Sequence, residues 1–196
     1  MSLLPRKYKC ATMGGKGRMI MALKEKALKR LTEKLTAAGV PFVLGGSWLL
    51  TQRGVLPEYH DFDVLTAPEQ AAAADRVLSR LGMRSEAQER DGCFHAAYHF
   101  DGADIDLCAG MAFDGGLRAV IDASSESEKA PVLGAQVPLG WVEDWLVWYS
   151  LMGRDSRAEA CLRYFAEHAA NRERFTACVD GPLPEALAAR IREAVG

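Results

Sequence analysis

The spacing of hydrophobic residues changes along this 196-residue chain from helical to strand-like and back to helical. Apolar positions recur every three or four residues over 19–38, which predicts an amphipathic helix that ends at Gly39. Two short apolar runs predict strands at 40–44 and 60–65. The helices predicted on either side of the second strand cover 47–52 and 69–81.

Two Asp-Gly pairs mark hairpin turns in the middle of the chain. Asp91-Gly92 and Asp101-Gly102 each separate runs in which polar and apolar residues alternate, and Asp-Gly suits the tight turn between antiparallel strands. The sequence therefore predicts a meander of three strands, at 84–90, 93–100 and 103–109.

A two-residue turn at Asp101-Gly102 fixes the pairing of the last two strands of the meander. It places His99 opposite Asp104 and Ala97 opposite Asp106, and residues that pair across a sheet point to the same face. The polar face of this hairpin then carries His95, His99, Asp104 and Asp106. A face of this kind is either exposed to solvent or lines a site.

The rest of the chain combines a glycine-containing stretch with a helical end. Residues 110–139 predict one or two short strands and a loop, and helical spacing returns after that. The helices predicted there cover 141–152, 155–170 and 184–195. The whole pattern predicts an α+β fold, with a mixed sheet flanked by helices. Its expected parts are a flexible leader at 1–18, an α/β domain at 19–139 and a C-terminal helical lobe at 140–196.

One stretch combines a glycine turn with an acidic pair. The first strand runs into Gly45, Gly46 and Ser47, and only glycine lets a phosphate approach the backbone without a Cβ in the way. On the second strand Asp61 and Asp63 are two residues apart, so their carboxylates lie on one face. Because neighbouring carboxylates repel each other, this placement favours a cation between them.

The composition is that of a soluble globular protein. Hydrophobic residues make up 49% and charged residues 26% of the chain. No apolar run approaches the ~20 residues of a membrane span, and the N-terminus lacks a signal-peptide core. We therefore expect a cytoplasmic protein without a membrane partner. Five cysteines without metal-ligand spacing agree with buried thiols in a reducing compartment: Cys10, Cys93, Cys108, Cys161 and Cys178.

The net charge of −2 hides a basic N-terminal segment. Residues 1–34 hold ten of the 24 Lys and Arg residues but two of the 26 Asp and Glu residues, so the rest of the chain is acidic. Such a segment either contacts phosphate or nucleic acid, or forms the solvated face of a helix that docks on the acidic body. We favour docking and expect no nucleic acid partner.

Three motifs in sequence order resemble the nucleotidyltransferase superfamily, which has the polymerase-β-like fold. They are Leu44-Gly45-Gly46-Ser47, Asp61-Phe62-Asp63-Val64 and Ile105-Asp106-Leu107. The order of the predicted elements is similar too, and the segment from Val137 to Arg154 resembles the start of the helical lobe in that superfamily. Among its branches, the chain is most similar to the minimal and antibiotic-resistance transferases. The resemblance covers about residues 38–165.

The resemblance implies two-metal chemistry with Mg²⁺ and a nucleoside triphosphate, for which ATP is expected. Three carboxylates would hold the metal ions and act in catalysis: Asp61, Asp63 and Asp106. In this scheme Asp106 orients or deprotonates the acceptor hydroxyl. Five residues would contact the nucleotide phosphates: Gly45, Gly46, Ser47, His60 and Arg154.

Several of these assignments leave an alternative open. Asp104 competes with Asp106 for the role of the third carboxylate, although apolar neighbours on both sides favour Asp106. His60 is equally a plain turn residue, and Arg154 equally a residue that stabilises the lobe. An aromatic stripe at helical spacing is typical of a helix core or lobe interface: Trp141, Trp145 and Trp148.

Two functions of different classes are compatible with this pattern. The first is a Mg²⁺-dependent nucleotidyltransferase that moves a nucleoside monophosphate to a hydroxyl of a small molecule, such as an aminoglycoside or lincosamide, or of a protein. An acidic body suits a cationic acceptor. The second is a non-enzymatic module on the same fold that acts through the basic N-terminal helix. The scarcity of basic residues around the motifs favours the module, and the three aspartates favour the enzyme. A metal protein built on the His and Asp residues of the hairpin is a third, weaker hypothesis.

Overall fold

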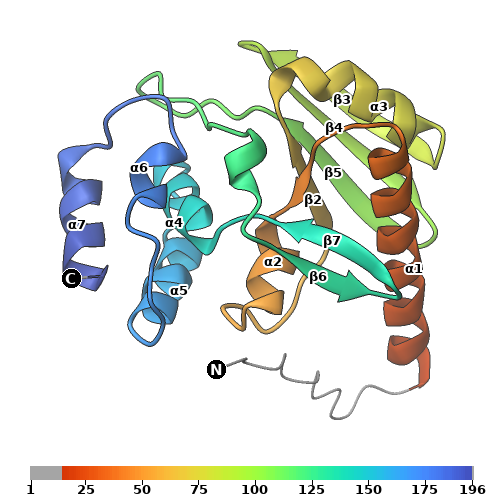
Figure 1. The fold of residues 1–196 in the computed structure, drawn as a ribbon, viewed down its shortest axis with the longest axis horizontal. Helices are drawn as coiled ribbons and strands as arrows, with labels where there is room; N and C mark the ends of the chain where they lie inside the picture. Colours follow the sequence, from red (N-terminus) through yellow and green to blue (C-terminus); the bar gives the residue numbers. More distant parts are fainter. Residues whose placement is uncertain (1–14, 196) are drawn as a thin grey trace.

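The structure is a computed structural model that describes residues 15–195, and its centre is one mixed sheet of seven strands. The strands are β1 (Val43–Leu44), β2 (Phe62–Thr66), β3 (Met83–Arg90), β4 (Cys93–Phe100), β5 (Ala103–Ala109), β6 (Glu128–Val132) and β7 (Ala135–Leu139). Their order across the sheet is β3-β4-β5-β2-β1-β7-β6 (Figure 1). Strand β2 runs parallel to β5 and antiparallel to β1, so it lies near the middle of the sheet.

The described part of the chain also contains seven α-helices. They are α1 (Gly15–Ala37), α2 (Gly46–Gln52), α3 (Ala71–Ser79), α4 (Val142–Leu151), α5 (Asp155–Phe165), α6 (Arg174–Ala177) and α7 (Glu185–Val195). Helices α1 and α3 contact each other and β5, whereas α2 packs between β2 and α4. Helices α4 to α7 form a lobe at one end of the molecule, far from α1 (Figure 1). The predicted α+β class with a C-terminal helical lobe is therefore correct.

The predicted meander is confirmed, with the bounds of its second and third strands and their register as expected, while its first strand begins one residue earlier, at Met83. Asp91 and Asp101 have positive φ angles of 52° and 50°, as the tight two-residue turn requires. His99 pairs with Asp104, and Ala97 with Asp106. The apolar face of this hairpin is buried in the core: Tyr98, Phe100, Ile105 and Leu107.

Other boundaries differ from the prediction. Helix α1 begins at Gly15, so the last four residues of the predicted leader are helical, because extending an existing helix adds a hydrogen bond per residue. Residues 1–14 of that leader lie outside the described residues. The helix predicted over 69–81 divides into a 3₁₀ turn, η1 (Pro68–Gln70), and α3. The helix predicted over 155–170 ends at Phe165. Helix α6 was not predicted, since four residues are too few to show periodicity.

The basic helix α1 docks on the body of the protein. The Lys24 ammonium donates a hydrogen bond to the His60 carbonyl at 2.7 Å, and Arg30 forms an ion pair with Asp101 at 3.1 Å. Exposed ion pairs of this kind contribute little energy each, but they orient the helix. The described part of the basic segment is therefore docked on the body of the protein, as predicted.

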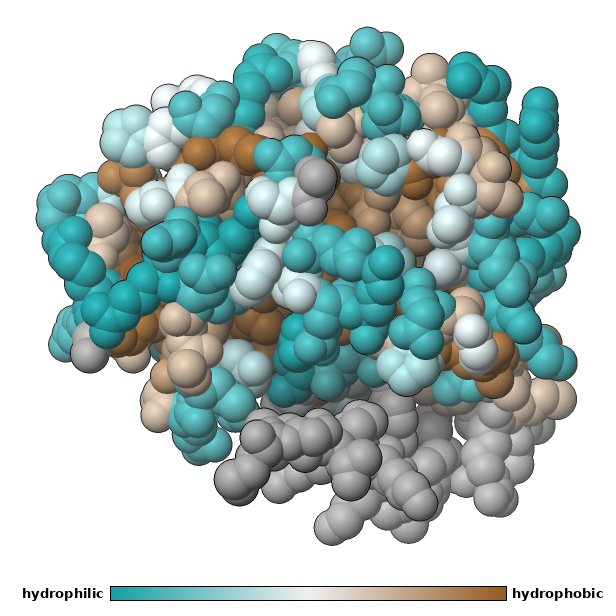
Figure 2. Space-filling model, viewed as in Figure 1, coloured by the Kyte–Doolittle hydropathy of each residue, from teal (hydrophilic) through white to brown (hydrophobic). Residues whose placement is uncertain are grey.

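Hydrophilic residues dominate the face shown in Figure 2, and hydrophobic ones appear mainly in recesses between them. None of the described helices is long and apolar enough to span a bilayer. The described cysteines are free thiols, of which Cys161 and Cys178 are buried as expected, while Cys93 and Cys108 are partly buried.

Helix α4 is the core of the C-terminal lobe, and a buried ion pair fastens α6 to it. Nearly every residue of α4 is buried, including Trp145 and Trp148, which confirms the prediction of a core stripe for these two rings. The Asp144 carboxylate accepts two hydrogen bonds from the Arg174 guanidinium, at 2.5 and 2.8 Å. The same guanidinium donates to Ser124 Oγ at 2.8 Å, in the 3₁₀ turn η2 (Ala123–Ser125). The lobe is thus tied to the segment that leads into β6.

Removal of one partner from this buried pair should be costly. Asp144→Ala leaves the Arg174 guanidinium without its counter-charge in a site where it is 4% exposed, and we expect a loss of about 3–5 kcal/mol in the free energy of unfolding. Glu159→Ala breaks the exposed ion pair with Arg190 and should cost less than about 1 kcal/mol. Urea denaturation of both variants measures the difference. Equal losses would contradict the structural role of the buried pair.

Candidate active site

The parallel pairing of β2 and β5 brings the predicted carboxylates together. Asp63 lies directly opposite Asp106, and Phe62 lies opposite Ile105. Because directions alternate along a strand, Asp63 and Asp106 point to one face while Phe62 and Ile105 are buried on the other. Asp61, two residues before Asp63, belongs to the same face.

The register also separates the two candidates for the third carboxylate. Asp106 is partly buried beside Asp63. Asp104 is exposed and forms an ion pair with His99, whose Nδ1 lies 2.7 Å from Asp104 Oδ1. The structure therefore places Asp106, and not Asp104, next to the acidic pair, although its chemical role stays a prediction.

Ser47 holds both members of the acidic pair. Its hydroxyl donates a hydrogen bond to Asp61 Oδ1 at 3.2 Å. Its backbone N–H, at the start of α2, donates to the Asp63 carboxylate. A single buried residue after the glycine turn thus orients two carboxylates on the neighbouring strand.

The two glycines before Ser47 are required by close packing from opposite sides. Gly46 has a φ of +55°, and a Cβ built there would lie 1.6 Å from Asp63 Oδ2. A Cβ at Gly45 would lie 2.5 Å from the Trp145 ring. The turn is therefore filled by an acidic side chain on one side and by the helical lobe on the other.

The carboxylates hold their protons more tightly than free aspartate does. Burial raises the pKa of Asp63 to about 7, with the charges of Asp61 and Asp106 adding to the rise. The Arg154 charge and the Ser47 N–H oppose it. Burial also raises the pKa of Asp106, and the nearby charge of His95 lowers it. This electrostatic crowding is what a bound cation would relieve.

The predicted phosphate contacts come from two sides of the site. His60 is exposed next to Asp61, and its carbonyl is bound by Lys24. Arg154 precedes α5, and its guanidinium carbon lies 5.9 Å from the centre of the Tyr149 ring. Arg53 turns away, since it forms an ion pair with Glu128 at 2.7 Å.

Sequence reasoning missed several residues that the structure adds to the site. Burial raises the pKa of Cys108, as do the charges of Asp63 and Asp106, so the thiol lies on the face of the carboxylates. Its spacing of two residues from Asp106 could have revealed this. Burial and the charge of Asp63 raise the pKa of Tyr149, and the Arg157 charge opposes that rise.

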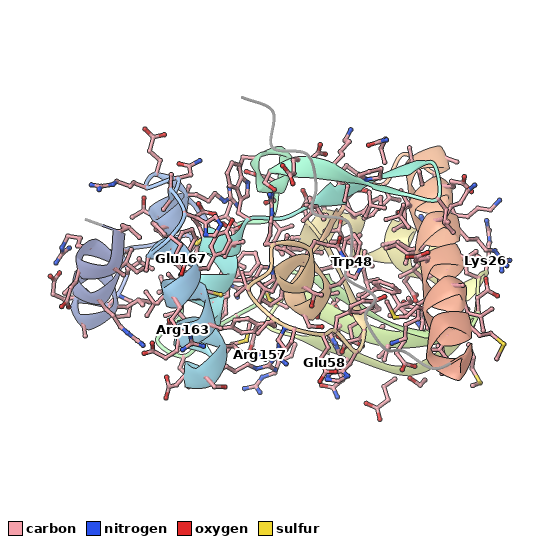
Figure 3. The ribbon with its side chains drawn as sticks, turned by 90° about the horizontal axis from the view of Figure 1, so that it is seen from below. Lys26, Trp48, Glu58, Arg157, Arg163 and Glu167 are labelled. Atoms are coloured by element: carbon pink, nitrogen blue, oxygen red, sulfur yellow. The ribbon has the colours of Figure 1, made fainter. Side chains whose placement is uncertain are left out.

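Two further residues of the lobe belong to the site, and of these Trp145 lies in the aromatic stripe that the sequence predicted for a helix core or lobe interface. Trp145 packs against Gly45, with its ring 5.0 Å from that of Tyr149. Arg157 of α5 lies at the same edge of the molecule as Glu58, from the loop before β2 (Figure 3). The charge of Arg154, which precedes α5, acts on Asp63, so the lobe supplies positive charge near the acidic strand.

The donor chemistry of the site fits Mg²⁺, which prefers carboxylate oxygens. All three predicted ligands are aspartates, and the raised pKa values of Asp63 and Asp106 reflect crowded negative charge. Within residues 15–195, however, no group of three His, Cys, Asp or Glu side chains is arranged to hold a metal ion as it stands. The third hypothesis, a metal protein built on the hairpin, therefore gains no support from the described residues.

The sequence of this chain matches a known protein family over the region that carries the carboxylates. Residues 27–136 match the family model of aminoglycoside-2''-adenylyltransferases, which is more than half of the chain. The match spans the glycine turn, the acidic pair and Asp106. Among curated proteins, none matches the sequence significantly.

Two solved structures have a similar fold. A Thermotoga maritima protein provisionally assigned as a nucleotidyltransferase is 17% identical with a TM-score of 0.54, over 82% of this chain and all of that one. The antibiotic-resistance factor ANT(2'')-Ia, solved in solution, is 16% identical with a TM-score of 0.51, over 92% of this chain and 94% of that one. The polymerase-β-like α+β fold expected from the motifs is therefore confirmed.

The contact between Gly46 and Asp63 can be tested against a glycine with the same backbone but open space. Gly54 has a φ of +74° and nothing within 4 Å of a built Cβ, so Gly54→Ala should cost only the backbone strain of about 1–2 kcal/mol. Gly46→Ala adds a clash with Asp63 and should cost about 1–3 kcal/mol more. Adding Asp63→Ala to Gly46→Ala should recover part of that excess. Chemical denaturation of the four proteins checks this, and absence of recovery would argue against the contact.

The pKa of Asp63 predicts a pH dependence of stability without divalent cations. The native state holds this proton more tightly than the unfolded chain, so its contribution is present below the unfolded pKa of 3.8. It is lost as the pH rises through about 7. The free energy of unfolding of Asp63→Asn should therefore fall less over this window than that of the wild type. Parallel slopes in urea denaturation would contradict the shift.

Proposed function

Because the chain belongs to the aminoglycoside-2''-adenylyltransferase family, we propose that it transfers a nucleoside monophosphate from a nucleoside triphosphate to a hydroxyl of a small cationic molecule. ATP is the expected donor, and an aminoglycoside is the expected kind of acceptor. The observation that carries the proposal is the register that sets Asp63 beside Asp106, with Asp61 on the same face. Asp63 packs against Gly46 and Asp61 is bound by Ser47, so the acidic pair lies at the glycine turn.

Asp61, Asp63 and Asp106 would hold Mg²⁺, as the chemistry of the donor set allows. When bound, Mg²⁺ neutralises phosphate charge and makes the attacked phosphorus more electrophilic. Ser47 prepares the site, because it holds Asp61 through its hydroxyl and Asp63 through its amide. Preorganised carboxylates need little rearrangement when the substrate arrives.

Asp106 is the group that we assign to the acceptor. Its raised pKa makes the carboxylate a better proton acceptor than free aspartate, as general-base catalysis near neutral pH requires. The proton of the acceptor hydroxyl would pass to an Asp106 carboxylate oxygen as that hydroxyl attacks the α-phosphate and pyrophosphate leaves. Asp104 is held by His99 and would not take part in this step.

Five residues would contact the nucleotide phosphates: Gly45, Gly46, Ser47, His60 and Arg154. The absence of a side chain at Gly46 keeps the backbone beside Asp63 open to a phosphate. Arg154 acts on Asp63 electrostatically and so is close enough to balance phosphate charge. We add Arg157, which acts on Tyr149 from the same side of the lobe.

The acidic body favours a cationic acceptor over an anionic one. Residues 35–196 hold most of the acidic residues of the chain, and Asp104 and Asp101 are exposed on the hairpin that carries Asp106. Such a surface attracts polyamines such as aminoglycosides. A protein hydroxyl remains the alternative acceptor, and a lincosamide is a further small-molecule candidate.

The decisive experiment measures pyrophosphate release from Mg²⁺ and ATP in the presence of aminoglycosides. Asp106→Asn removes the proposed base and one of the three proposed metal ligands, so it should lower turnover by about 10²–10⁴-fold. Nucleotide binding through Asp61 and Asp63 should persist. Asp104→Asn, on the same face, is the matched control and should keep turnover within a few fold. Asp61→Ala with Asp63→Ala should abolish the thermal shift produced by Mg²⁺ and ATP.

Two results would overturn the proposal. One is the absence of nucleotide binding at millimolar ATP with Mg²⁺. The other is nucleotide binding without pyrophosphate release for aminoglycoside, lincosamide and protein acceptors alike. The second result would favour a binding module on the same fold that acts through the basic helix α1.

A further inference from the structure

A cavity lies away from the carboxylates, where the α/β domain meets the helical lobe. Its volume is about 210 Å³, and its walls come from the C-terminal end of α2, the start of β6, and helices α4 and α5. The residues that matter for its chemistry are Arg53, Glu128, Trp141, Glu143, Tyr164 and Phe165.

This cavity is distinct from the candidate active site. Arg53 follows the last residue of α2, whereas Gly46, which touches Asp63, is the first. A helix of this length is about 10 Å long, so the two sites lie at opposite ends of α2. None of the predicted metal or phosphate contacts lines the cavity.

A buried acid in the wall of the cavity lacks a counter-charge. Glu143 is 6% exposed, and its Oε1 accepts a hydrogen bond from the Asn171 backbone N–H at 2.8 Å. Its second oxygen, Oε2, accepts no hydrogen bond from the described residues and is not one of their fully buried unpaired atoms, so it remains in contact with solvent. No Lys or Arg among the described residues forms an ion pair with Glu143. Buried carboxylates are normally paired, because removing an isolated charge from water is costly.

The other charges around the cavity already balance each other. Arg53 forms an ion pair with Glu128 at 2.7 Å and donates a hydrogen bond to Ser127 Oγ at 3.2 Å. This pair is neutral as a whole, so Glu143 leaves the cavity with one excess negative charge. The cavity therefore favours a monovalent cation over a neutral or anionic guest.

Three aromatic rings form a large part of the remaining lining. Trp141, Tyr164 and Phe165 come from the start of α4 and the end of α5. The faces of such rings attract organic cations, and their apolar surface suits a carbon skeleton. A carboxylate with several rings is the combination that recognises alkylammonium groups.

We propose that this cavity binds a small organic cation, a primary amine or guanidinium on a short apolar body. The charged group would face Glu143, and the apolar body would lie against Trp141 and Tyr164. The volume is below the ~300 Å³ of typical drug-sized pockets, so the ligand is small. Because both the α/β domain and the lobe line the cavity, the ligand would hold them together, independently of any transfer activity.

Benzylammonium is a suitable probe, with benzyl alcohol as its neutral counterpart. Calorimetry on the full chain should detect benzylammonium binding and a rise in Tm, and little of either with benzyl alcohol. Glu143→Gln keeps an oxygen for the Asn171 amide but removes the charge, so it should weaken binding about tenfold or more. Glu167→Gln changes an exposed acid of the same lobe outside the cavity and should bind as the wild type does.

Further variants separate this site from the carboxylates and guard against misfolding. Asp63→Asn should bind benzylammonium unchanged, since it alters only the other site. Ala169→Trp, which narrows the cavity from its exposed rim, should abolish binding without removing any charge. The proposal fails if wild type does not bind, if Glu143→Gln binds as well as wild type, or if Asp63→Asn loses binding.

Discussion

The crowding of negative charge on β2 and β5 is the constraint around which this molecule is built. Three aspartates share one face of a sheet whose other face is apolar core. Their side chains therefore stay close together on that one face. The cost appears as the raised pKa of Asp63 and of Asp106. Two residues of the glycine turn accommodate this crowding. Ser47 binds two of the carboxylates, and Gly46 leaves room for one of them.

The helical lobe completes the arrangement from outside the sheet. Trp145 packs on Gly45, so α4 closes the glycine turn from the side opposite Asp63. The buried pair between Asp144 and Arg174 fastens the lobe to the segment before β6. This attachment holds the start of α5 in place, where the charge of Arg154 acts on Asp63 and the charge of Arg157 acts on Tyr149.

The two acidic sites of the molecule differ in their physics. The carboxylates of β2 and β5 crowd each other, and oxygen ligands in such number suit a divalent ion and its phosphate partner. Glu143, at the other end of α2, has no ion-pair partner among the described residues and lies beside aromatic rings. This combination suits a single organic cation. Helix α2 thus separates the two cation sites that we propose, and we expect their selectivities to differ.

The sequence by itself determined the features that depend on short-range chemistry. Asp-Gly turns fix φ locally, so the hairpin register and the polar face with Asp106 could be read directly. The alternation along β2 likewise placed Asp61 and Asp63 on one face. Tertiary structure decided what depends on distant segments meeting: the parallel pairing that chose Asp106 over Asp104, and the packing of Trp145 on Gly45. Tertiary structure also decided the burial of Glu143, because the sequence around an acidic residue does not show which distant segments will pack against it.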